Sequence, residues 1–278
     1  MDDLGFQIES ALSWFPHEED TPYALVRVSE EDAESWVETL RDAFRRAYLS
    51  DEFLDTRAQE LEHEVGGTRE ERQVEIICSK LPDPGSIMSG DFGEIIVYFY
   101  QAVGAHPKVA FGPKKWRLKE SRTKAAPYSD VVHFILPDWP TPTEKDEILC
   151  SEVKSKATDS GGNPIEKAIE DCAKDRTSRL AKTLVWLRDR AISEDLGTVK
   201  LAHLDRFINA TDHPSATKRF HAVAVICSNL AEAELVNAPD TSSAEYTLTV
   251  IVVPDLQAVY TAVFQAVKES SLPEKPAP

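Results

Sequence analysis

The amino-acid sequence predicts an α/β fold in which a mixed central sheet is flanked by helices. From residue 85 onward, helical and strand patterns follow in the order helix, strand, strand, helix, strand, strand, helix. Residues 220–228 and 246–253 are strongly apolar runs of a length suited to buried strands. A hydrophobic content of 42% is enough for the core of such a fold.

The N-terminal residues 1–84 are predicted to form an α+β extension to this core. Residues 23–28 have the pattern of a short strand. A helix follows, with Ser29 as its N-cap and Asp32 three residues later in a capping-box-like arrangement. Its apolar stripe consists of Trp36, Val37, Leu40, Phe44, Ala47 and Tyr48. This stripe would pack either on the core or on a partner.

Two further elements are expected in the extension. Residues 51–64 form a more polar helix that ends at Gly66 and Gly67. Residues 73–80 are apolar and β-branched, and are predicted as a strand.

The predicted core spans residues 85–268. Asp91 opens a helix with an apolar stripe that ends near Gly104, and the basic segment after it is a strand or a loop. Strands are expected at 131–136, 147–153, 220–228 and 246–253, and helices at 165–192 and 256–267. Residues 269–278 are expected to be a disordered tail.

Membrane and secreted proteins are excluded by the composition. No run of about 18 apolar residues is present, and the N-terminus is acidic where a signal peptide is basic. The four cysteines form no CxxC pair and sit in apolar or helical surroundings, so buried free thiols are expected. The sequence therefore predicts a cytoplasmic protein.

The net charge of −17 is unevenly distributed. Residues 1–64 contain 18 Asp and Glu against 5 Arg and Lys, whereas residues 108–124 contain seven basic residues against Glu120 alone. The members of the basic segment considered for phosphate contacts are Lys114, Lys115, Arg117, Lys119, Arg122 and Lys124. A solvated basic face explains the same pattern, and both interpretations stay open.

Asp130, Glu152 and Lys154 are the candidate catalytic residues. Phosphodiester hydrolysis needs hard oxygen ligands for a divalent cation, together with a cationic group near the water or the phosphate. Residues two apart on a strand share a face, so Glu152 and Lys154 point the same way. The loop between the two strands is centred near residue 141, and a symmetric hairpin about this centre places Asp130 opposite Glu152.

Three neighbouring residues have other expected roles. Glu94 either forms a capping pair with Asp91 or contributes to the metal site, and the two roles are compatible. His133 is out of phase with Asp130 and is interpreted as a packing residue. Lys156 continues the face of Glu152 if the strand extends that far.

These motifs resemble those of known nucleases. SD at 129–130 and SEVKSK at 151–156, after a helix containing GDFGEI, resemble the PD-(D/E)xK nuclease signature, although Pro127 stands three residues before Asp130 and not directly before it. With the intervening basic segment and PYSDVVHF, residues 85–255 resemble the HamA family, nuclease subunits of the two-component Hachiman anti-phage defence system that are partnered by a helicase.

The resemblance implies a restriction-endonuclease-like core and a metal-dependent DNA endonuclease. Glu94, Asp130 and Glu152 would then bind Mg²⁺ or Mn²⁺, with Lys154 as the catalytic lysine. The acidic charge of the N-terminal region separately suggests that residues 1–84 are a lobe that docks a basic, DNA-engaging partner, for which the resemblance supplies the helicase; acidic helices that only keep the domain soluble are the alternative. Two alternatives remain: a non-catalytic, nuclease-like adaptor that binds a partner protein, and a nuclease that acts on RNA.

Overall fold

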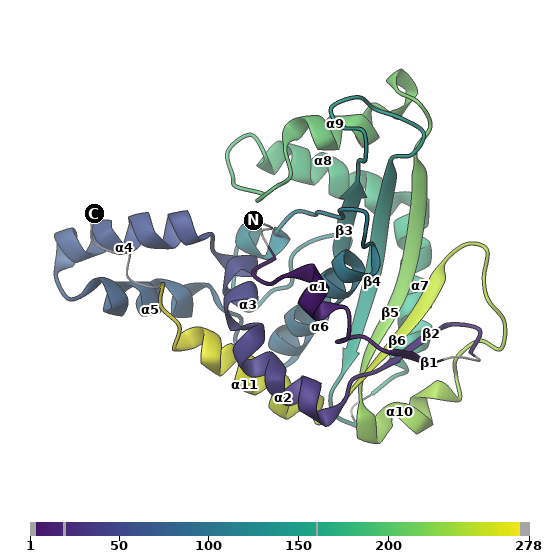
Figure 1. The fold of residues 1–278 in the computed structure, drawn as a ribbon, viewed down its shortest axis with the longest axis horizontal. Coiled ribbons are helices and arrows are strands. Elements are labelled where there is room, and N and C mark those ends of the chain that lie inside the picture. The colour runs from purple at the N-terminus through teal and green to yellow at the C-terminus, as the bar shows by residue number, and fades with distance from the viewer. Residues whose placement is uncertain (1–3, 19–20, 160, 273–278) are drawn as a thin grey trace.

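A single mixed sheet with helices on both faces organises the molecule (Figure 1). The computed structural model describes residues 4–18, 21–159 and 161–272. Across the described residues the sheet has six strands, in the order β1-β2-β6-β5-β4-β3. The strands are β1 (His17–Glu18), β2 (Ala24–Arg27), β3 (Val131–Ile135), β4 (Glu147–Lys156), β5 (Thr217–Cys227) and β6 (Thr247–Val253). The four inner strands are parallel, and β1 and β3 are antiparallel edges.

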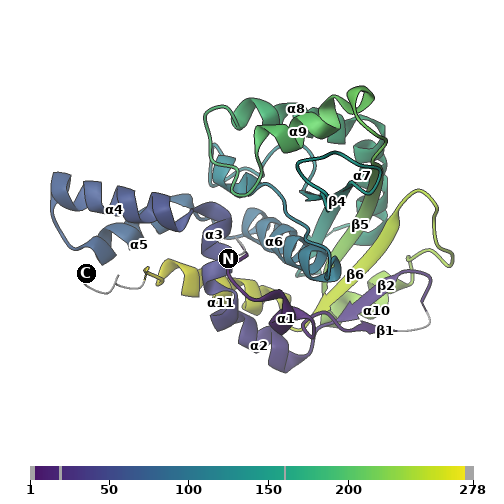
Figure 2. The same cartoon turned by 45° about the horizontal axis from the view of Figure 1, so that its top comes forward.

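Helices cover the two faces of the sheet in separate groups. Their bounds are α1 (Ile8–Ala11), α2 (Glu30–Thr39), α3 (Arg41–Tyr48), α4 (Asp51–Val65), α5 (Arg69–Lys80), α6 (Ser86–Gly104), α7 (Pro164–Lys174), α8 (Leu180–Arg190), α9 (Leu201–Ile208), α10 (Ser228–Leu235) and α11 (Leu256–Lys268). One apolar cluster joins one face of the sheet to α2, α3, α6 and α11. On the other face α7 and α10 pack over β5 and β6, and α8 and α9 pack over β3 and β4 (Figure 2).

The β3–β4 hairpin has the predicted register. Val131 pairs with Ser151 and Ile135 pairs with Glu147, so one more step along the hairpin places Asp130 beside Glu152. Strand β4 is longer than predicted, because residues 154–156 continue to pair with β5. This extension keeps Glu152, Lys154 and Lys156 on one face of a regular strand.

The N-terminal residues are part of the main fold. Strand β2 pairs in parallel with β6, with Ala24 opposite Thr249. Trp36 and Phe44 are fully buried, and the Phe44 ring stacks on Phe92 of α6 with 5.3 Å between centroids. The predicted apolar stripe therefore packs on the core, and the boundary expected at residue 84 does not separate two structural units.

Helices α4 and α5 extend away from this body as an antiparallel helical hairpin (Figures 1 and 2). The prediction of a strand at 73–80 was wrong, because this segment belongs to α5. Thr68 and Glu71 form a capping box at its start, and Ile76 and Ile77 are buried. Here capping and burial of one helical face outweigh the β-propensity of the residues.

Most other predicted elements are confirmed. The two apolar runs form β5 and β6, and the helix expected at 256–267 is α11. The long helix expected at 165–192 is present as α7, a π-helical turn η2 (Asp175–Arg179) and α8. The basic segment forms a loop with one 3₁₀ turn, η1 (Lys115–Leu118). A second 3₁₀ turn, η3 (Ala210–Asp212), and the short helices α1, α9 and α10 were not predicted.

The tail and the cysteines complete the comparison with the sequence. Ser270 is buried and the backbone N–H of Leu272 donates to Gln73 Oε1, so these two residues of the expected disordered tail contact the fold, whereas Glu269 and Ser271 are exposed. Residues 273–278 of the expected disordered tail lie outside the described residues. All four cysteines are free thiols, three of them buried and Cys78 partly exposed. Among the described helices, none has the length and apolarity needed to cross a membrane.

Candidate active site

Asp130 is fixed at the start of β3 by the backbone of the neighbouring strand. Its Oδ2 atom accepts a hydrogen bond from the N–H of Val153 at 2.8 Å, which continues the hairpin pairing by one step. The preceding Ser129 is fully buried, and its Oγ donates to Asp175 at 2.8 Å. The carboxylate of Asp130 is therefore held at a defined position next to Glu152.

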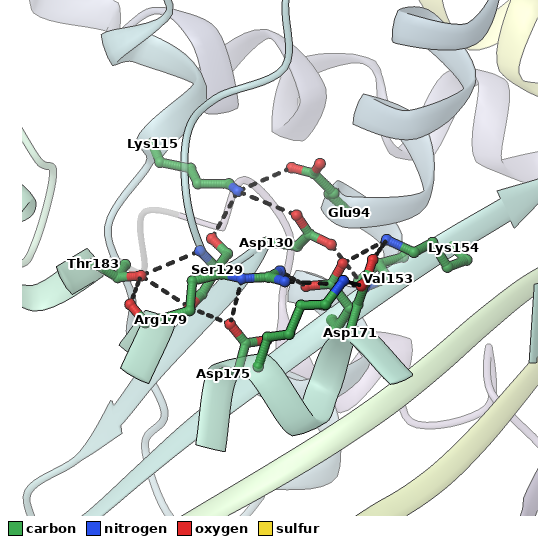
Figure 3. A network of polar contacts seen from close by, with 12 residues as sticks. Glu94, Lys115, Ser129, Asp130, Val153, Lys154, Asp171, Asp175, Arg179 and Thr183 are labelled. Atoms are coloured by element: carbon green, nitrogen blue, oxygen red, sulfur yellow. Dashed lines mark hydrogen bonds and ion pairs between the residues drawn. The ribbon is translucent and has the colours of Figure 1, made fainter. Parts of the chain in front are cut away.

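Lys154 extends from β4 toward Asp171 of α7 (Figure 3). Glu152, on the same face of β4, pairs with Arg179 of the π turn that follows α7. The Nζ atom of Lys154 lies 2.5 Å from Glu152 Oε1 and 2.8 Å from Asp171 Oδ2. Glu152 is almost fully buried, whereas the side chain of Lys154 is 27% exposed. The lysine therefore connects the buried carboxylate to the surface.

Glu94 reaches the site from the other side of the sheet, on α6. Because α6 begins at Ser86, five residues before Asp91, the interpretation of Asp91 and Glu94 as a capping pair was wrong. The buried carboxylate of Glu94 accepts from Trp116 Nε1 at 3.1 Å. Lys115 Nζ lies 3.4 Å from Glu94 Oε2 and 3.8 Å from Asp130 Oδ1, between the two carboxylates.

Asp171, Asp175 and Arg179 belong to the cluster and were missed by the sequence reasoning. Arg179 Nη1 lies 2.5 Å from Glu152 Oε2, and its Nε lies 3.5 Å from Asp175. These residues recur every four positions along one helical stretch, a spacing that places side chains on one face and could have indicated the set. Asp175 to Arg179 form the π turn, a distortion often found at functional sites.

The cluster contains more carboxylates than cations. Its five carboxylates are Glu94, Asp130, Glu152, Asp171 and Asp175, and its four cations are Lys115, Lys154, Lys174 and Arg179. Crowding of this kind raises the pKa of an acid in addition to the effect of burial.

The pKa values follow this pattern. Burial raises the pKa of Glu94 to about 8, with Asp130 adding to the shift and Lys115 opposing it. Burial also raises the pKa of Glu152 to about 8, helped by the negative charge of Asp130 and opposed by Lys154. The pKa of Lys154 is raised because the attraction of Glu152 and Asp171 exceeds the opposing effect of burial.

The donor set fits a divalent cation in ligand type. Carboxylate oxygens are the ligands that Mg²⁺ and Mn²⁺ prefer. As the side chains stand in this structure, the described residues contain no group of three or more His, Cys, Asp or Glu that is arranged to hold a metal ion. The ammonium of Lys115 lies between Glu94 and Asp130, so a metal ion bound by both requires this lysine to move.

The basic segment is mostly internal, which corrects the expectation of a basic surface. Lys114 is fully buried with Nζ 4.2 Å from the centre of the Tyr98 ring, and Lys115 is in the cluster. Lys119 pairs with buried Asp91 at 2.6 Å, and Arg117 pairs with Asp195 at 2.7 Å. A lysine with a buried carboxylate partner is held inside the fold and is not available to a phosphate backbone.

Both ends of the segment are open to solvent, and Lys108 at its start is exposed and pairs with Glu147 at 2.6 Å. Arg122 is exposed and pairs with Asp83 at 2.8 Å, and Lys124 is exposed. His133 is buried, with its Nδ1 3.0 Å from Gln101 Oε1 and its ring on Tyr98, which confirms its packing role. Lys156 continues the face of Glu152, as expected, and pairs with Glu234.

Fold and cluster together define an α/β protein with a buried carboxylate and lysine site at the edge of a mixed sheet. The chain belongs to the HamA family, whose family model matches residues 11–267. Membership in this family supports a role in Hachiman defence. No curated protein matches the sequence.

Proposed function

We propose that the chain is a metal-dependent DNA endonuclease of the PD-(D/E)xK type and the effector subunit of a Hachiman defence complex. The main support is the placement of Asp130 beside Glu152 on adjacent strands, with Lys154 on the face of Glu152. The carboxylate oxygens of Glu94, Asp130 and Glu152 are ligands of the type that Mg²⁺ and Mn²⁺ prefer, which supports a divalent cation as cofactor. DNA as the substrate is inferred from the family.

In this proposal Asp130 and Glu152, with Glu94, would hold Mg²⁺ or Mn²⁺. The cation would supply Lewis-acid polarisation of the scissile phosphate and activation of water. Lys154 would orient the attacking water and offset the negative charge that develops on the phosphate in the transition state. Its contact with Asp171 at 2.8 Å fixes its ammonium group, and its raised pKa keeps it protonated at neutral pH.

Glu152→Gln and Lys154→Met test the catalytic assignment. With Mg²⁺ or Mn²⁺ and plasmid DNA, each substitution is expected to lower the cleavage rate by a factor on the order of 10² or more. Glu144→Gln is the matched control, because Glu144 is exposed in the loop at the opposite end of the hairpin. Cleavage at the wild-type rate by either variant, or cleavage that persists in a chelator, contradicts the assignment.

The same assay addresses the two alternatives. A wild-type chain that cuts no nucleic acid, alone or with its partner, while its Glu152→Gln variant forms the same complex, favours the adaptor function. A matched RNA substrate that is cut faster than DNA assigns the activity to RNA.

A helicase partner is the second part of the proposal, and the α4–α5 hairpin is its candidate docking element. Residues 51–80 contain nine carboxylates against four basic residues. Phe53 and Val65 expose about half or more of their surface on this hairpin. A projecting, acidic element with exposed apolar side chains suits a basic surface with apolar pockets.

Residues for testing the docking must be chosen outside the internal ion pairs. Asp51 pairs with Arg45 and Arg46, and Asp55 pairs with Arg69, so their reversal would disturb the hairpin itself. Glu52→Lys with Phe53→Ser is the sharper variant, because both side chains are exposed. We expect it to weaken complex formation with a helicase encoded beside the chain, measured by sedimentation. An unchanged complex rules out this end of the hairpin as the docking element.

A further inference from the structure

A cavity of about 500 Å³ adjoins the candidate active site. It lies between the first turns of α6, the end of β4, the loop before α7 and the start of α11. Lys154 forms part of its wall, so the cavity and the carboxylate cluster share a side chain. A group bound there lies next to a group bound at the cluster.

The wall of the cavity is suited to an anion. Lys154, Lys156 and Lys167 line it. Lys154 pairs with Glu152 and Asp171, and Lys156 pairs with Glu234, so Lys167 is the lining lysine whose ammonium group faces an incoming anion. The hydroxyls of Ser89 and Ser155 meet at 3.0 Å in the wall and add donors. Lys167 is exposed and packs on the glycine loop, where a Cβ on Gly162 would lie 2.3 Å from its Nζ.

Gly90 supplies an independent argument for a ligand. It lies within the 19-residue helix α6 and lines the cavity, and a Cβ built on it meets no heavy atom within 4 Å. Glycine inside a helix destabilises it relative to alanine. Gly93, one turn later, is explained by packing, because its Cβ would lie 3.3 Å from Ser155. No such contact explains Gly90, whereas a bound group that occupies the cavity does.

We propose that this cavity binds a backbone phosphate of the nucleic-acid strand, next to the phosphate held at the carboxylate cluster. The inference rests on the proposed nuclease function. A phosphate offers acceptor oxygens to Lys167 and to the two hydroxyls, and the N-termini of α6 and α7 beside the cavity favour negative charge. Lys154 then lies between two phosphates of the same strand. The phosphate in the cavity positions the strand, and the phosphate at the carboxylate cluster is the one that is cleaved.

Binding without cleavage tests the proposal. The full chain is titrated with a fluorescent oligonucleotide in the absence of divalent metal, with inorganic phosphate as competitor. Gly90→Ala is expected to weaken oligonucleotide binding by about 10-fold or more, while raising Tm by about 2–4 °C because alanine favours the helix. Lys167→Gln is expected to weaken binding and to flatten its salt dependence.

Two control variants separate a local effect from a general one. Gly104→Ala lies at the other end of α6, also facing open space, and Lys145→Gln removes an exposed lysine at the far end of the hairpin. Both are expected to bind the oligonucleotide as the wild type does. If Gly90→Ala gains stability and still binds like the wild type, the cavity is not a phosphate site.

Single neutral methylphosphonate linkages locate the phosphate. A methylphosphonate at one internal position of the oligonucleotide is expected to abolish the difference in binding affinity between the wild type and Lys167→Gln. Sensitivity to the terminal 5′-phosphate alone, or to no position, overturns the placement. Failure of the nuclease function is a separate result: the wild type then cuts no substrate, while the effects of Gly90→Ala and Lys167→Gln on phosphate-dependent binding remain.

Discussion

The two ends of the β3–β4 hairpin bury charge in different ways. At the loop end, Asp146 and Arg206 form a pair at 2.7 Å in which both side chains are 1% exposed. Arg206 also donates to the carbonyl oxygens of Thr143 and Pro214. At the open end, five carboxylates face four cations. One end pairs a single acid with a single base and fixes the loop, whereas the other holds more acids than bases, and burial raises the pKa of Glu94 and Glu152 there.

The largest expected effect on stability is at the loop end. Asp146→Asn leaves the guanidinium of Arg206 buried without its carboxylate, so we expect a loss of about 3–5 kcal/mol in the free energy of unfolding. Denaturant unfolding measures it. Asp138→Asn, which removes an exposed pair with Lys145, is the control and is expected to cost less than about 1 kcal/mol. Equal losses in the free energy of unfolding for Asp146→Asn and Asp138→Asn would contradict the distinction between the buried pair and the exposed pair.

At the open end, removing a carboxylate is expected to stabilise the metal-free protein. The folded-state pKa of Glu94, about 8, is above its ordinary value of 4.5. Its stabilising contribution is therefore fully present below pH 4.5 and is lost as the pH rises through 8. Glu94→Gln mimics the protonated acid, so its advantage over the wild type should grow from pH 5 to pH 8.5, on the order of 2 kcal/mol.

Thermal unfolding at several pH values measures this difference. A destabilised Glu94→Gln protein at pH 8.5 would show that the negative charge of Glu94 is already compensated, and the contrast between the two ends would fail.

The smallest expected effect is that of the metal ion on stability. Millimolar Mg²⁺ or Mn²⁺ should raise the Tm of the wild type by about 2–4 °C, because a ligand that binds only the folded state stabilises it. Asp130→Asn should lose most of this shift, and Asp146→Asn should retain it. An equal shift in both variants would place the bound cation away from the cluster.

Local patterns were sufficient to predict the central hairpin. A loop centred near residue 141 set the register, and the two-residue period of a strand set the faces of Glu152 and Lys154. Exposure could not be predicted in the same way. Lys115 appears in the sequence as one of seven basic residues in a run, but it is buried because Glu94 and Asp130 approach it from other elements.

The remaining errors have the same origin. The four-residue spacing of Asp171, Asp175 and Arg179 was visible, but only the packing of α7 against β4 shows that they face Glu152. The segment 73–80 was assigned by its β-branched residues, and the cap at Thr68 that starts α5 lies outside that window. In both cases the outcome depends on contacts or caps that lie outside the local sequence window used for the prediction.

The pairing of β2 with β6 has a consequence for synthesis on the ribosome. Ala24 is synthesised long before its partner Thr249. Until Thr249 emerges, β2 has no neighbour on that side, and the apolar faces of α2 and α3 lack α11. The nascent chain therefore already contains every residue of the carboxylate cluster, from Glu94 to Arg179, before its sheet can close. Until β6 and α11 are made, an apolar surface stays exposed and available to chaperones.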